Sequence, residues 1–509
     1  MLPEVARAGQ ADVYSMFRTR ARERQEALAL EDGEIRRTYG ALLGRVDSLA
    51  AALLARGIEP GDRIAILLHN RSDYVELQLA AAAIGAIVAC LNWRLAPPEL
   101  RHCIELVSPR LGVVEPGLRA CFEAVSGIPV LEIGTDWEKV IAAAEPDPRT
   151  GTMVQEPEAG LNILYTSGTT GLPKGALISH RAHIARAMVF AAQLALEPAD
   201  AFIAWAPMFH MASTDHVLAT LLRGGTVVMI DGLQPREINA ALSRHQVGWL
   251  VMMPGAIEAF IAERRANPMP IKGVRVVGAM ADLVPPHQIA QLTSLVNAPY
   301  LNSFGSTETG LPPATASLIS PGLMPERLSK RLSAFCEARL VDSDGREVPD
   351  GTPGEMTVRG PTLFSGYWND GKTNARDFRG GFFHMGDVFR RNADGTIDFV
   401  DRAKYLIKSG GENVYPAEIE RLLLAHPQVM DAAVVRARDA RWGESPVAFV
   451  ARATEGLDAG DLMRLCSEQL AGYKRPREIR FIAFEDFPRS TSGKVQRHVL
   501  EAWIEGEAD

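Results

Sequence analysis

The feature that constrains this chain most is the stretch from Leu161 to Ala176, which reads Leu-Asn-Ile-Leu-Tyr-Thr-Ser-Gly-Thr-Thr-Gly-Leu-Pro-Lys-Gly-Ala. A short apolar run, typical of a buried strand, ends in a loop of Ser, Thr and Gly that carries one lysine, Lys174. Glycines let backbone N–H groups approach an anion closely, and the hydroxyl groups add donors. The spacing is not that of a Walker A loop, which needs Gly, four residues and then Gly-Lys-Ser/Thr. The stretch therefore indicates a strand followed by a loop that can wrap a polyphosphate.

The composition is that of an ordinary globular enzyme. The chain has 509 residues, enough for roughly three domain-sized units. Its net charge of −8 argues against non-specific nucleic-acid binding, so we expect no nucleic-acid partner. The 5 cysteines lack metal-ligand spacing, and the N-terminal residues lack the pattern of a signal peptide. We expect a cytoplasmic protein with no integral membrane segment, and a homodimer is compatible with the sequence.

Apolar patterns divide the chain into regions of different character. Strand-like and helical patterns alternate through the first half, which favours a parallel α/β architecture, and residues 77–93 read as a buried helix that leads into a strand. From Cys336 to Val400, short strands alternate with Gly, Pro and Asp turns, and Asn392-Ala-Asp-Gly395 predicts a hairpin. A new α/β unit begins after Asp401, and its first helix should span residues 416–424.

Five further stretches complete a pattern with the first. They are Ala206-Pro-Met-Phe-His210, Asn302-Ser-Phe-Gly-Ser-Thr-Glu308, residues 354–369 with Gly386-Asp387, residues 401–420, and Pro488-Arg-Ser-Thr-Ser-Gly-Lys-Val495. In this order the six stretches resemble the motifs of the adenylate-forming superfamily, which holds acyl-CoA synthetases, firefly luciferases and peptide-synthetase adenylation domains. The resemblance runs from residue 161 to residue 495, and residues 354–369 match a mainly structural signature in it.

The resemblance implies an α/β fold with two parts. A large N-terminal adenylation domain over residues 1–401 would hold two α/β subdomains and a small β-barrel-like subdomain. A small mobile α/β domain would follow over residues 402–509. Lys404 takes the hinge position, where a few torsions would swing the small domain.

The resemblance also implies a nucleotide site. Phe304 would lie against the adenine, Asp387 would accept the ribose hydroxyls, and Arg402 would meet the ribose or phosphate. Glu308 would hold Mg²⁺, a hard cation that prefers carboxylate and phosphate oxygens. The implied ATP- and AMP-binding residues are Thr166, Ser167, Gly168, Thr169, Thr170, Gly171, Lys174, Ser303, Phe304, Gly305, Asp387 and Arg402.

The same resemblance assigns the catalytic and CoA-binding groups. Lys494 would contact the substrate carboxylate and the α-phosphate region, and the His210 ring would lie beside the acyl carboxylate. The pantetheine channel of CoA would be bordered by Ser409, Gly410 and Gly411, where a missing Cβ leaves room for the thiol arm. The implied catalytic residues are Lys494, Glu308, Thr307 and His210.

The expected reaction has two steps. A carboxylate is a poor electrophile, so attack of its oxygen on the α-phosphorus of MgATP gives an acyl adenylate, from which CoA takes the acyl group and releases AMP. We therefore expect an AMP-forming carboxylate–CoA ligase. Three alternatives remain: an enzyme that loads a separate carrier protein, a luciferase-like oxidase, and a nucleotide-binding scaffold without catalysis. Intact Glu308, Asp387, Arg402 and Lys494 argue against the last of these.

The acid itself is predicted from the residues expected around the acyl group. They are apolar and rich in methionine, which suits an adaptable hydrophobic slot for a medium-chain, branched or aromatic acid. The polar run Ser213-Thr-Asp-His216 stands where the family commonly has Gly, and Asp215 or His216 facing the pocket would point to a polar substituent on the acid. Gly278-Ala-Met280 also replaces a Gly-Gly-Ala type stretch, and residues 332–336 lack a Gly-x-Pro turn. The expected pocket residues are Phe209, Met211, Met252, Gly278, Ala279 and Met280.

Overall fold

The computed structural model describes residue 8 and residues 10–150, 155–166, 172–409, 412–489 and 495–506. The chain forms two compact units. Unit 1 comprises Met1–Glu337 with Arg359–Arg379, and unit 2 comprises Ala338–Val358 with Gly380–Asp509. The chain therefore enters unit 2, returns once to unit 1, and then completes unit 2.

A six-stranded sheet forms the first half of unit 1. Its strands are β3 (Arg63–Leu67), β4 (Ile87–Cys90), β5 (Leu111–Val114), β6 (Val130–Glu132), β7 (Gly160–Thr166) and β8 (Lys174–Ser179). They lie in the order β6-β5-β3-β4-β7-β8. All neighbours are parallel except β7 and β8, which form an antiparallel pair. Strands β4 and β5 are buried along their whole length, as parallel strands are when helices cover both faces.

An eight-stranded sheet forms the rest of the core of unit 1. Its strands are β1 (Leu28–Asp32), β2 (Ile35–Thr38), β9 (Ala201–Ala204), β10 (Val227–Met229), β11 (Val247–Leu250), β12 (Val274–Val277), β13 (Tyr300–Leu301) and β16 (Leu318–Ile319). They lie in the order β16-β13-β12-β11-β9-β10-β1-β2, with antiparallel strands at both edges. A separate hairpin is made by β14 (Phe304–Ser306) and β15 (Gly310–Ala314).

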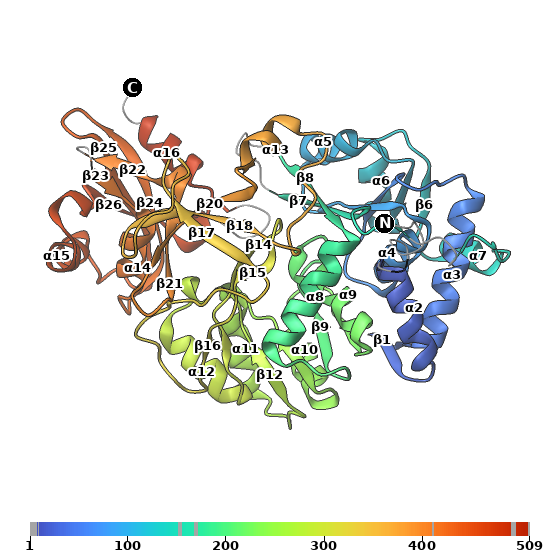
Figure 1. The fold of residues 1–509 in the computed structure, drawn as a ribbon. Helices are drawn as coiled ribbons and strands as arrows, with labels where there is room; N and C mark the ends of the chain where they lie inside the picture. Colours follow the sequence, from blue (N-terminus) through green and yellow to red (C-terminus); the bar gives the residue numbers. More distant parts are fainter. Residues whose placement is uncertain are drawn as a thin grey trace. The chain divides into compact units, whose positions relative to one another are not determined.

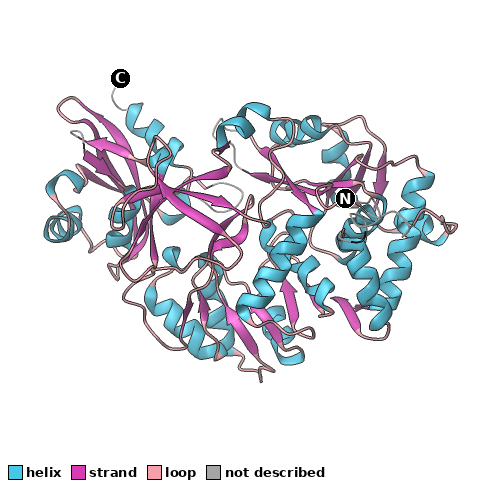
Figure 2. Cartoon of the chain, in the orientation of Figure 1, coloured by secondary structure: helices cyan, strands magenta, loops and turns pink. Residues whose placement is uncertain are grey.

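Helices gather around both sheets of unit 1, and α8 lies beside α9 (Figures 1 and 2). The first group is α2 (Val13–Glu23), α3 (Tyr39–Ala55), α4 (Ser72–Ile84), α5 (Pro97–Val107), α6 (Pro116–Glu123), α7 (Thr135–Ala142) and α8 (His180–Leu194). The others are α9 (Met211–Arg223), α10 (Pro235–Arg244), α11 (Pro254–Ala266), α12 (Pro286–Val296), α13 (Gly371–Asp377) and the 3₁₀ turn η1 (Ala281–Leu283), and the short strand β19 (Phe378–Arg379) follows α13. Every residue of α4 is buried, so the predicted buried helix leading into a strand is confirmed.

Unit 2 holds two further sheets. In the first, β17 (Glu337–Val341), β18 (Pro353–Arg359) and β20 (Phe382–Arg391) are neighbours, and β21 (Ile397–Arg402) forms the expected hairpin with β20. The second contains β22 (Ile407–Ser409), β23 (Glu412–Val414), β24 (Val429–Asp439), β25 (Gly443–Arg452) and β26 (Glu478–Phe481). Its helices are α14 (Pro416–Leu424), α15 (Ala459–Gln469) and α16 (Arg497–Glu505), with 3₁₀ turns η2 (Ala403–Tyr405), η3 (Gly472–Lys474) and η4 (Phe484–Asp486).

Strand β24 shows how the second sheet of unit 2 is buried on both faces. Its side chains alternate in direction, as the pleat requires. Ala432 and Val434 join a core with helix α14, whereas Ala433 and Val435 join a core that includes Leu500 of α16. This α/β unit agrees with the fold predicted for the end of the chain, whereas the domain boundary after Asp401 stays a prediction.

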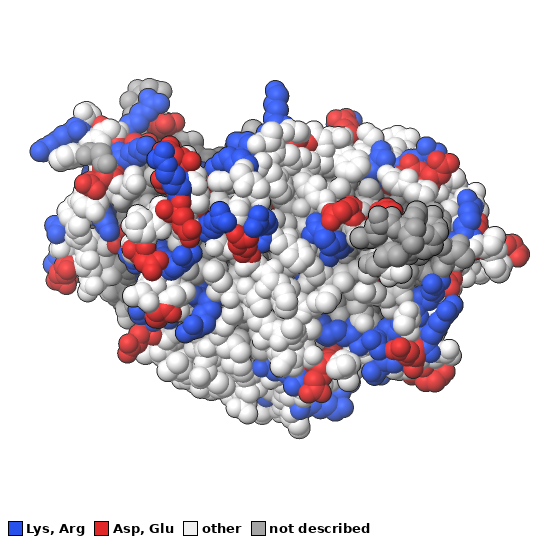
Figure 3. Space-filling model, in the orientation of Figure 1, with Lys and Arg blue, Asp and Glu red and all other residues white. Residues whose placement is uncertain are grey.

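The face of the molecule shown in Figure 3 has no single dominant charge. Basic and acidic side chains are interspersed over the face shown in Figure 3. Among the helices that the structure describes, none combines the length and apolar character needed to cross a membrane.

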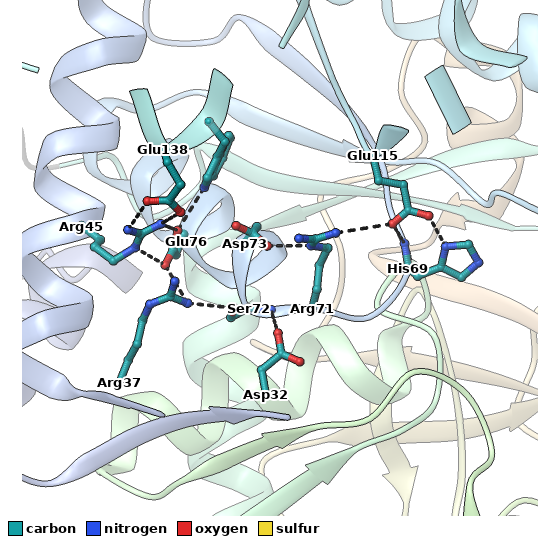
Figure 4. Close-up of polar contacts among 11 residues, drawn as sticks. Asp32, Arg37, Arg45, His69, Arg71, Ser72, Asp73, Glu76, Glu115 and Glu138 are labelled. Carbon is teal, nitrogen blue, oxygen red and sulfur yellow. Dashed lines mark hydrogen bonds and ion pairs between the residues drawn. The ribbon is translucent and has the colours of Figure 1, made fainter. Parts of the chain in front are cut away.

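A polar network joins the two sheets of unit 1 near the start of α4 (Figure 4). The carboxylate of Glu76 is fully buried and lies 3.2 Å from Arg37 and 2.7 Å from Arg45. The indole Nε1 of Trp137 donates to the same carboxylate at 3.3 Å. Because Arg37 belongs to β2 and Glu76 to α4, this charge pairing connects the eight-stranded sheet to a helix of the six-stranded one.

We expect Glu76→Ala to destabilise unit 1 by about 3 to 5 kcal/mol, because it removes the carboxylate that pairs with the largely buried Arg37 and one of the two carboxylates that pair with Arg45. Glu138→Ala is the matched control, since Glu138 binds the same Arg45 but is 54% exposed. Its loss should cost less than about 1 kcal/mol. Urea unfolding followed by tryptophan fluorescence compares the two, and equal losses would contradict the prediction.

Candidate active site

The two strands that flank the stretch rich in glycine and hydroxyl groups form an antiparallel pair. Strand β7 ends at Thr166, β8 begins at Lys174, and these two residues are paired across the hairpin. Both side chains are half-buried. The predicted strand before the loop is confirmed, whereas the loop residues named above as phosphate ligands lie outside the described part of the chain. These residues are Ser167, Gly168, Thr169, Thr170 and Gly171.

Thr307 and Glu308 form the tip of the β14–β15 hairpin. Gly305 in β14 permits the close approach of the two strands, because a Cβ there would lie 2.1 Å from the carbonyl oxygen of Gly310. The turn is closed by Thr309, whose Oγ1 accepts the N–H of Ser306 at 3.0 Å. The hairpin therefore brings Phe304, the predicted adenine contact, and Glu308, the predicted magnesium ligand, onto one short element.

Tyr367 connects this hairpin to the loop lysine. Its hydroxyl donates to Oε1 of Glu308 at 2.8 Å, and the Nζ of Lys174 lies 5.0 Å from the centre of its ring. Burial, together with the charge of Glu308, raises the pKa of Tyr367, so its phenol stays a hydrogen-bond donor at neutral pH. The sequence interpretation missed this role, because 59 positions separate Tyr367 from Glu308 and its motif reads as structural.

The surroundings of Glu308 fit a magnesium ion that arrives with ATP. Its backbone carbonyl is fixed by the N–H of Phe364 at 2.8 Å, and Tyr367 holds one carboxylate oxygen. Within the described ranges, no three His, Cys, Asp or Glu side chains cluster as a metal cage would require. Mg²⁺ usually binds one or two protein carboxylates and completes its shell with substrate phosphates and water. A single oriented carboxylate is therefore a suitable donor set.

Asn70 holds the segment that leads to His210. Its side-chain Nδ2 donates to the carbonyls of Ala204, Ala206 and Ile230 at 3.0, 2.7 and 3.1 Å, and its Oδ1 accepts the N–H of Met208 at 2.8 Å. Asn70 follows β3 of the six-stranded sheet, whereas the groups that it binds lie at or just after the ends of β9 and β10 of the eight-stranded sheet. A single asparagine gave no sequence signal for this role, because its partners are more than 130 positions away.

The orientation of the His210 ring is set by the helix that it begins. His210 caps α9, and its Nδ1 accepts the N–H of Ala212 at 3.2 Å. A neutral ring in this position must carry its proton on Nε2. His210 is half-buried at the start of α9, and its predicted role beside the acyl carboxylate stays a prediction.

The predicted acyl-pocket segment Gly278–Met280 is fixed beside Ser303, the residue that precedes the β14–β15 hairpin. Trp249 donates to the carbonyl of Gly278 at 2.9 Å, and Tyr300 donates to that of Ala279 at 2.8 Å. The N–H of Met280 donates to Oγ of Ser303 at 3.1 Å, so the two predicted segments touch. Gly278 has φ +84°, and a Cβ there would lie 2.1 Å from the Tyr300 ring. Of the remaining predicted pocket residues, Met211 and Met252 are buried and Phe209 is half-buried.

Asp215 and His216 are both engaged inside unit 1. Asp215 lies 3.0 Å from Arg186 and 3.2 Å from His183. The ring of His216 packs against Phe190 and Trp249, with centroid distances of 4.5 and 4.4 Å. Burial lowers the pKa of His216 to about 3, so this imidazole is neutral at physiological pH. Asp215 is thus neutralised by Arg186, and His216 is an uncharged member of an aromatic cluster.

Unit 2 brings the predicted ribose ligands together. Asp387 in β20 and Arg402 in β21 are paired in register, and Arg402 Nε lies 3.1 Å from Asp387 Oδ1. Lys404, at the predicted hinge, is exposed in η2, and Ser409 is buried at the end of β22. Gly410, Gly411 and Lys494 lie outside the described residues.

The residues that flank Lys494 are well anchored. Arg489 and Val495 form an antiparallel bridge. Arg497 donates to both oxygens of Glu420 at 2.6 Å, and its guanidinium lies 4.3 Å from the centre of the Tyr405 ring. Both ends of the predicted catalytic-lysine segment are therefore fixed within unit 2.

Comparison with known proteins identifies the family. The AMP-binding enzyme family matches residues 17–368, and the AMP-binding enzyme C-terminal domain matches residues 418–494. The indoleacetate–CoA ligase of Aromatoleum aromaticum is 32% identical, with 90% of this chain and 92% of that protein covered. The sulfoacetate–CoA ligase of Cupriavidus necator is 32% identical, with 90% and 91% covered.

A solved structure of a CoA synthetase has a similar fold. The o-succinylbenzoate CoA synthetase of Bacillus subtilis, in complex with its acyl-adenylate intermediate, is 27% identical and has a TM-score of 0.84, with 97% of this chain and 98% of that chain covered. The chain therefore belongs to the AMP-binding enzyme family, and its predicted place in the adenylate-forming superfamily, as an AMP-forming carboxylate–CoA ligase, is confirmed.

Proposed function

We propose that this enzyme activates an apolar carboxylic acid with MgATP and transfers the acyl group to CoA. The observation that carries the proposal is the pair of contacts that Tyr367 makes, with Lys174 and with Glu308. These contacts link the lysine of the predicted phosphate-binding stretch to the predicted magnesium ligand. The names of the relatives support CoA as the acceptor, and a separate carrier protein is the alternative acceptor.

In the first step the acid and ATP must meet although both are anionic. Positioning and positive charge therefore dominate the catalysis. Lys174 and Thr307 would orient the phosphates, and the N–H at Nε2 of His210 would orient the acyl carboxylate. Mg²⁺, held by Glu308 and the phosphates, would supply charge that stabilises the transferring phosphoryl group.

In the second step the thiol of CoA must reach the acyl carbon, next to which Lys494 would lie during the first step. We propose that residues 402–509 move as a domain about Lys404, which withdraws Lys494 and presents Ser409, Gly410 and Gly411 to the pantetheine arm. Lys404 is suited to a hinge because its side chain is exposed, and its carbonyl accepts the guanidinium of Arg436 at 2.5 Å.

The substrate class follows from the charges near the acyl group. All six predicted pocket residues are uncharged, and the charge of Asp215 is balanced by Arg186. An aromatic, branched or medium-chain acid suits such a pocket better than an acid with a second ionised group, because an unpaired buried charge is costly. The indoleacetate ligase supports an aromatic acid, whereas the sulfoacetate ligase is the reason to test a doubly charged one.

We expect pyrophosphate release from MgATP that needs both CoA and an apolar acid. A panel of indoleacetate, phenylacetate, octanoate, a branched short-chain acid, sulfoacetate and malonate, assayed with and without CoA, measures this directly. Preference for sulfoacetate or malonate would contradict the substrate class. Release that stops after about one equivalent even with CoA would identify a carrier protein as the acceptor.

Lys494→Ala should abolish adenylation and spare thioester formation from synthetic acyl adenylate. One preorganised donor of this type contributes roughly 3 to 4 kcal/mol to the transition state, which corresponds to a rate loss of about 100- to 1,000-fold. The control is Lys139→Ala, since Lys139 is an exposed lysine of α7. Comparable losses in both half-reactions would contradict this division of roles.

Tyr367→Phe should raise the Mg²⁺ concentration needed for half-maximal pyrophosphate release by about tenfold, because it frees the Glu308 carboxylate but keeps the ring beneath Lys174. Tyr14→Phe removes a similar bond elsewhere in unit 1, where Tyr14 donates to Asp47 at 2.5 Å. The Tyr14 variant should keep the Mg²⁺ requirement of the wild type. An unchanged requirement in Tyr367→Phe would exclude an orienting role for its hydroxyl.

A further inference from the structure

Arg186 is a buried cation to which the sequence interpretation gave no role. It lies in α8, and its side chain is 4% exposed. Its Nε donates to the carbonyl of Thr362 at 2.9 Å, and one terminal nitrogen donates to the carbonyl of Thr307 at 3.1 Å. The other terminal nitrogen donates to Oδ2 of Asp215 at 3.0 Å. One guanidinium thus joins α8, α9, the tip of the β14–β15 hairpin and the segment that follows β18.

The two carbonyls that Arg186 binds belong to the segments that hold Glu308. Thr307 directly precedes Glu308, and Thr362 lies two residues before Phe364, whose N–H binds the carbonyl of Glu308. The second of these segments also carries Tyr367, which binds the carboxylate of Glu308. Arg186 therefore fixes both backbones between which Glu308 is held.

Gly310 leaves space for the side chain of Arg186. Gly310, at the start of β15, has φ +74°, and a Cβ there would lie 2.8 Å from Cδ of Arg186. Both the backbone conformation and the space exclude a larger residue at this position. The stem of Arg186 therefore packs directly on the hairpin whose tip its guanidinium binds.

A buried relay orients Arg186 from the opposite side. Oδ1 of Asp215 lies 3.2 Å from Nδ1 of His183, and Nε2 of His183 accepts from Nδ2 of Asn162 at 2.9 Å. Because Nε2 accepts, Nδ1 is the ring nitrogen that can carry a proton, and it is the one that faces Asp215. Asn162 lies in β7, the strand that ends at the loop predicted to bind phosphate.

The charge of Asp215 is maintained by its partners. Burial acts to raise its pKa, but Arg186 and His183 more than offset this effect, so the pKa of Asp215 lies below its ordinary range. An ionised Asp215 holds the planar guanidinium in one plane, and this leaves the remaining N–H groups aimed at the two carbonyls. A lysine could place only a single point charge there.

We propose that Arg186 is a positioning residue, which with Asp215 sets the position of the hairpin tip Thr307–Glu308 relative to strand β7. The proposal rests on the proposed function, because it assigns Arg186 an effect on MgATP. It predicts that substitution of Arg186 weakens the binding of ATP more when Mg²⁺ is present than when it is absent, since Glu308 acts on the nucleotide through the metal.

The test compares Arg186→Lys with Arg45→Lys in the full-length chain. Arg45 is also a largely buried arginine paired with a buried carboxylate, Glu76, and its contacts lie outside the candidate site. Isothermal titration calorimetry gives the dissociation constant of ATP with MgCl₂ and with EDTA for each variant, and differential scanning calorimetry gives its unfolding temperature. The charge-free pair Arg186→Gln with Asp215→Asn provides a second variant if the lysine variant does not fold.

We expect Arg186→Lys to weaken the binding of MgATP by about 10- to 100-fold, the usual effect of removing a group that orients a metal ligand, with a much smaller change in EDTA. Arg45→Lys should bind MgATP as the wild type does, although both variants unfold at a lower temperature. Wild-type affinity for MgATP in Arg186→Lys, or equal weakening with and without Mg²⁺, would overturn the positioning role of Arg186 and leave the proposed function standing. A wild-type chain that does not bind MgATP overturns the proposed function and this inference with it.

Discussion

The need to pair buried backbone groups where strands end governs the rest of unit 1. Beyond Ala204 the chain leaves a parallel sheet, so the carbonyl and N–H groups up to Met208 need partners other than a neighbouring strand. Asn70 supplies four hydrogen bonds to this region from the neighbouring sheet. Each group left unpaired would cost about 1 to 3 kcal/mol, so the two sheets are held with their carboxyl ends adjacent. Open α/β sheets bind ligands at such edges, and His210 follows directly.

Buried charges have a comparable role where segments distant in sequence meet. Glu76 joins β2, α3 and α4, and Arg186 joins α8 and α9 to Thr307, which is 121 positions away. Each charge has an oppositely charged partner, because a lone charge in these surroundings would be too costly to retain. Pairs of this kind contribute less to net stability than to a unique arrangement, which is what a site that positions two anions needs.

The sequence predicted the local elements well and the contacts between them poorly. Helix α14 has its predicted bounds because Pro416 fits only the first turn of a helix, and the β20–β21 hairpin follows from the turn residues Asn392 to Gly395. Tyr367, Asn70 and Arg186 were missed because each binds at least one group that lies 59 or more positions away. Propensity and periodicity report on neighbours along the chain, and nothing in them identifies which carbonyl a distant arginine will meet.

The polar run from Ser213 to His216 shows how a departure from a family pattern can mislead. If Asp215 or His216 faced the pocket, the run would point to an acid with a polar substituent. In the fold, Ser213 donates to the carbonyl of Ala206 at 2.6 Å, and Thr214 donates to that of Met208. Asp215 neutralises Arg186, and His216 packs uncharged against Trp249. Because all four side chains serve contacts inside unit 1, the run is explained without the substrate, and the choice of acid is better argued from the apolar residues Met211, Met252 and Met280.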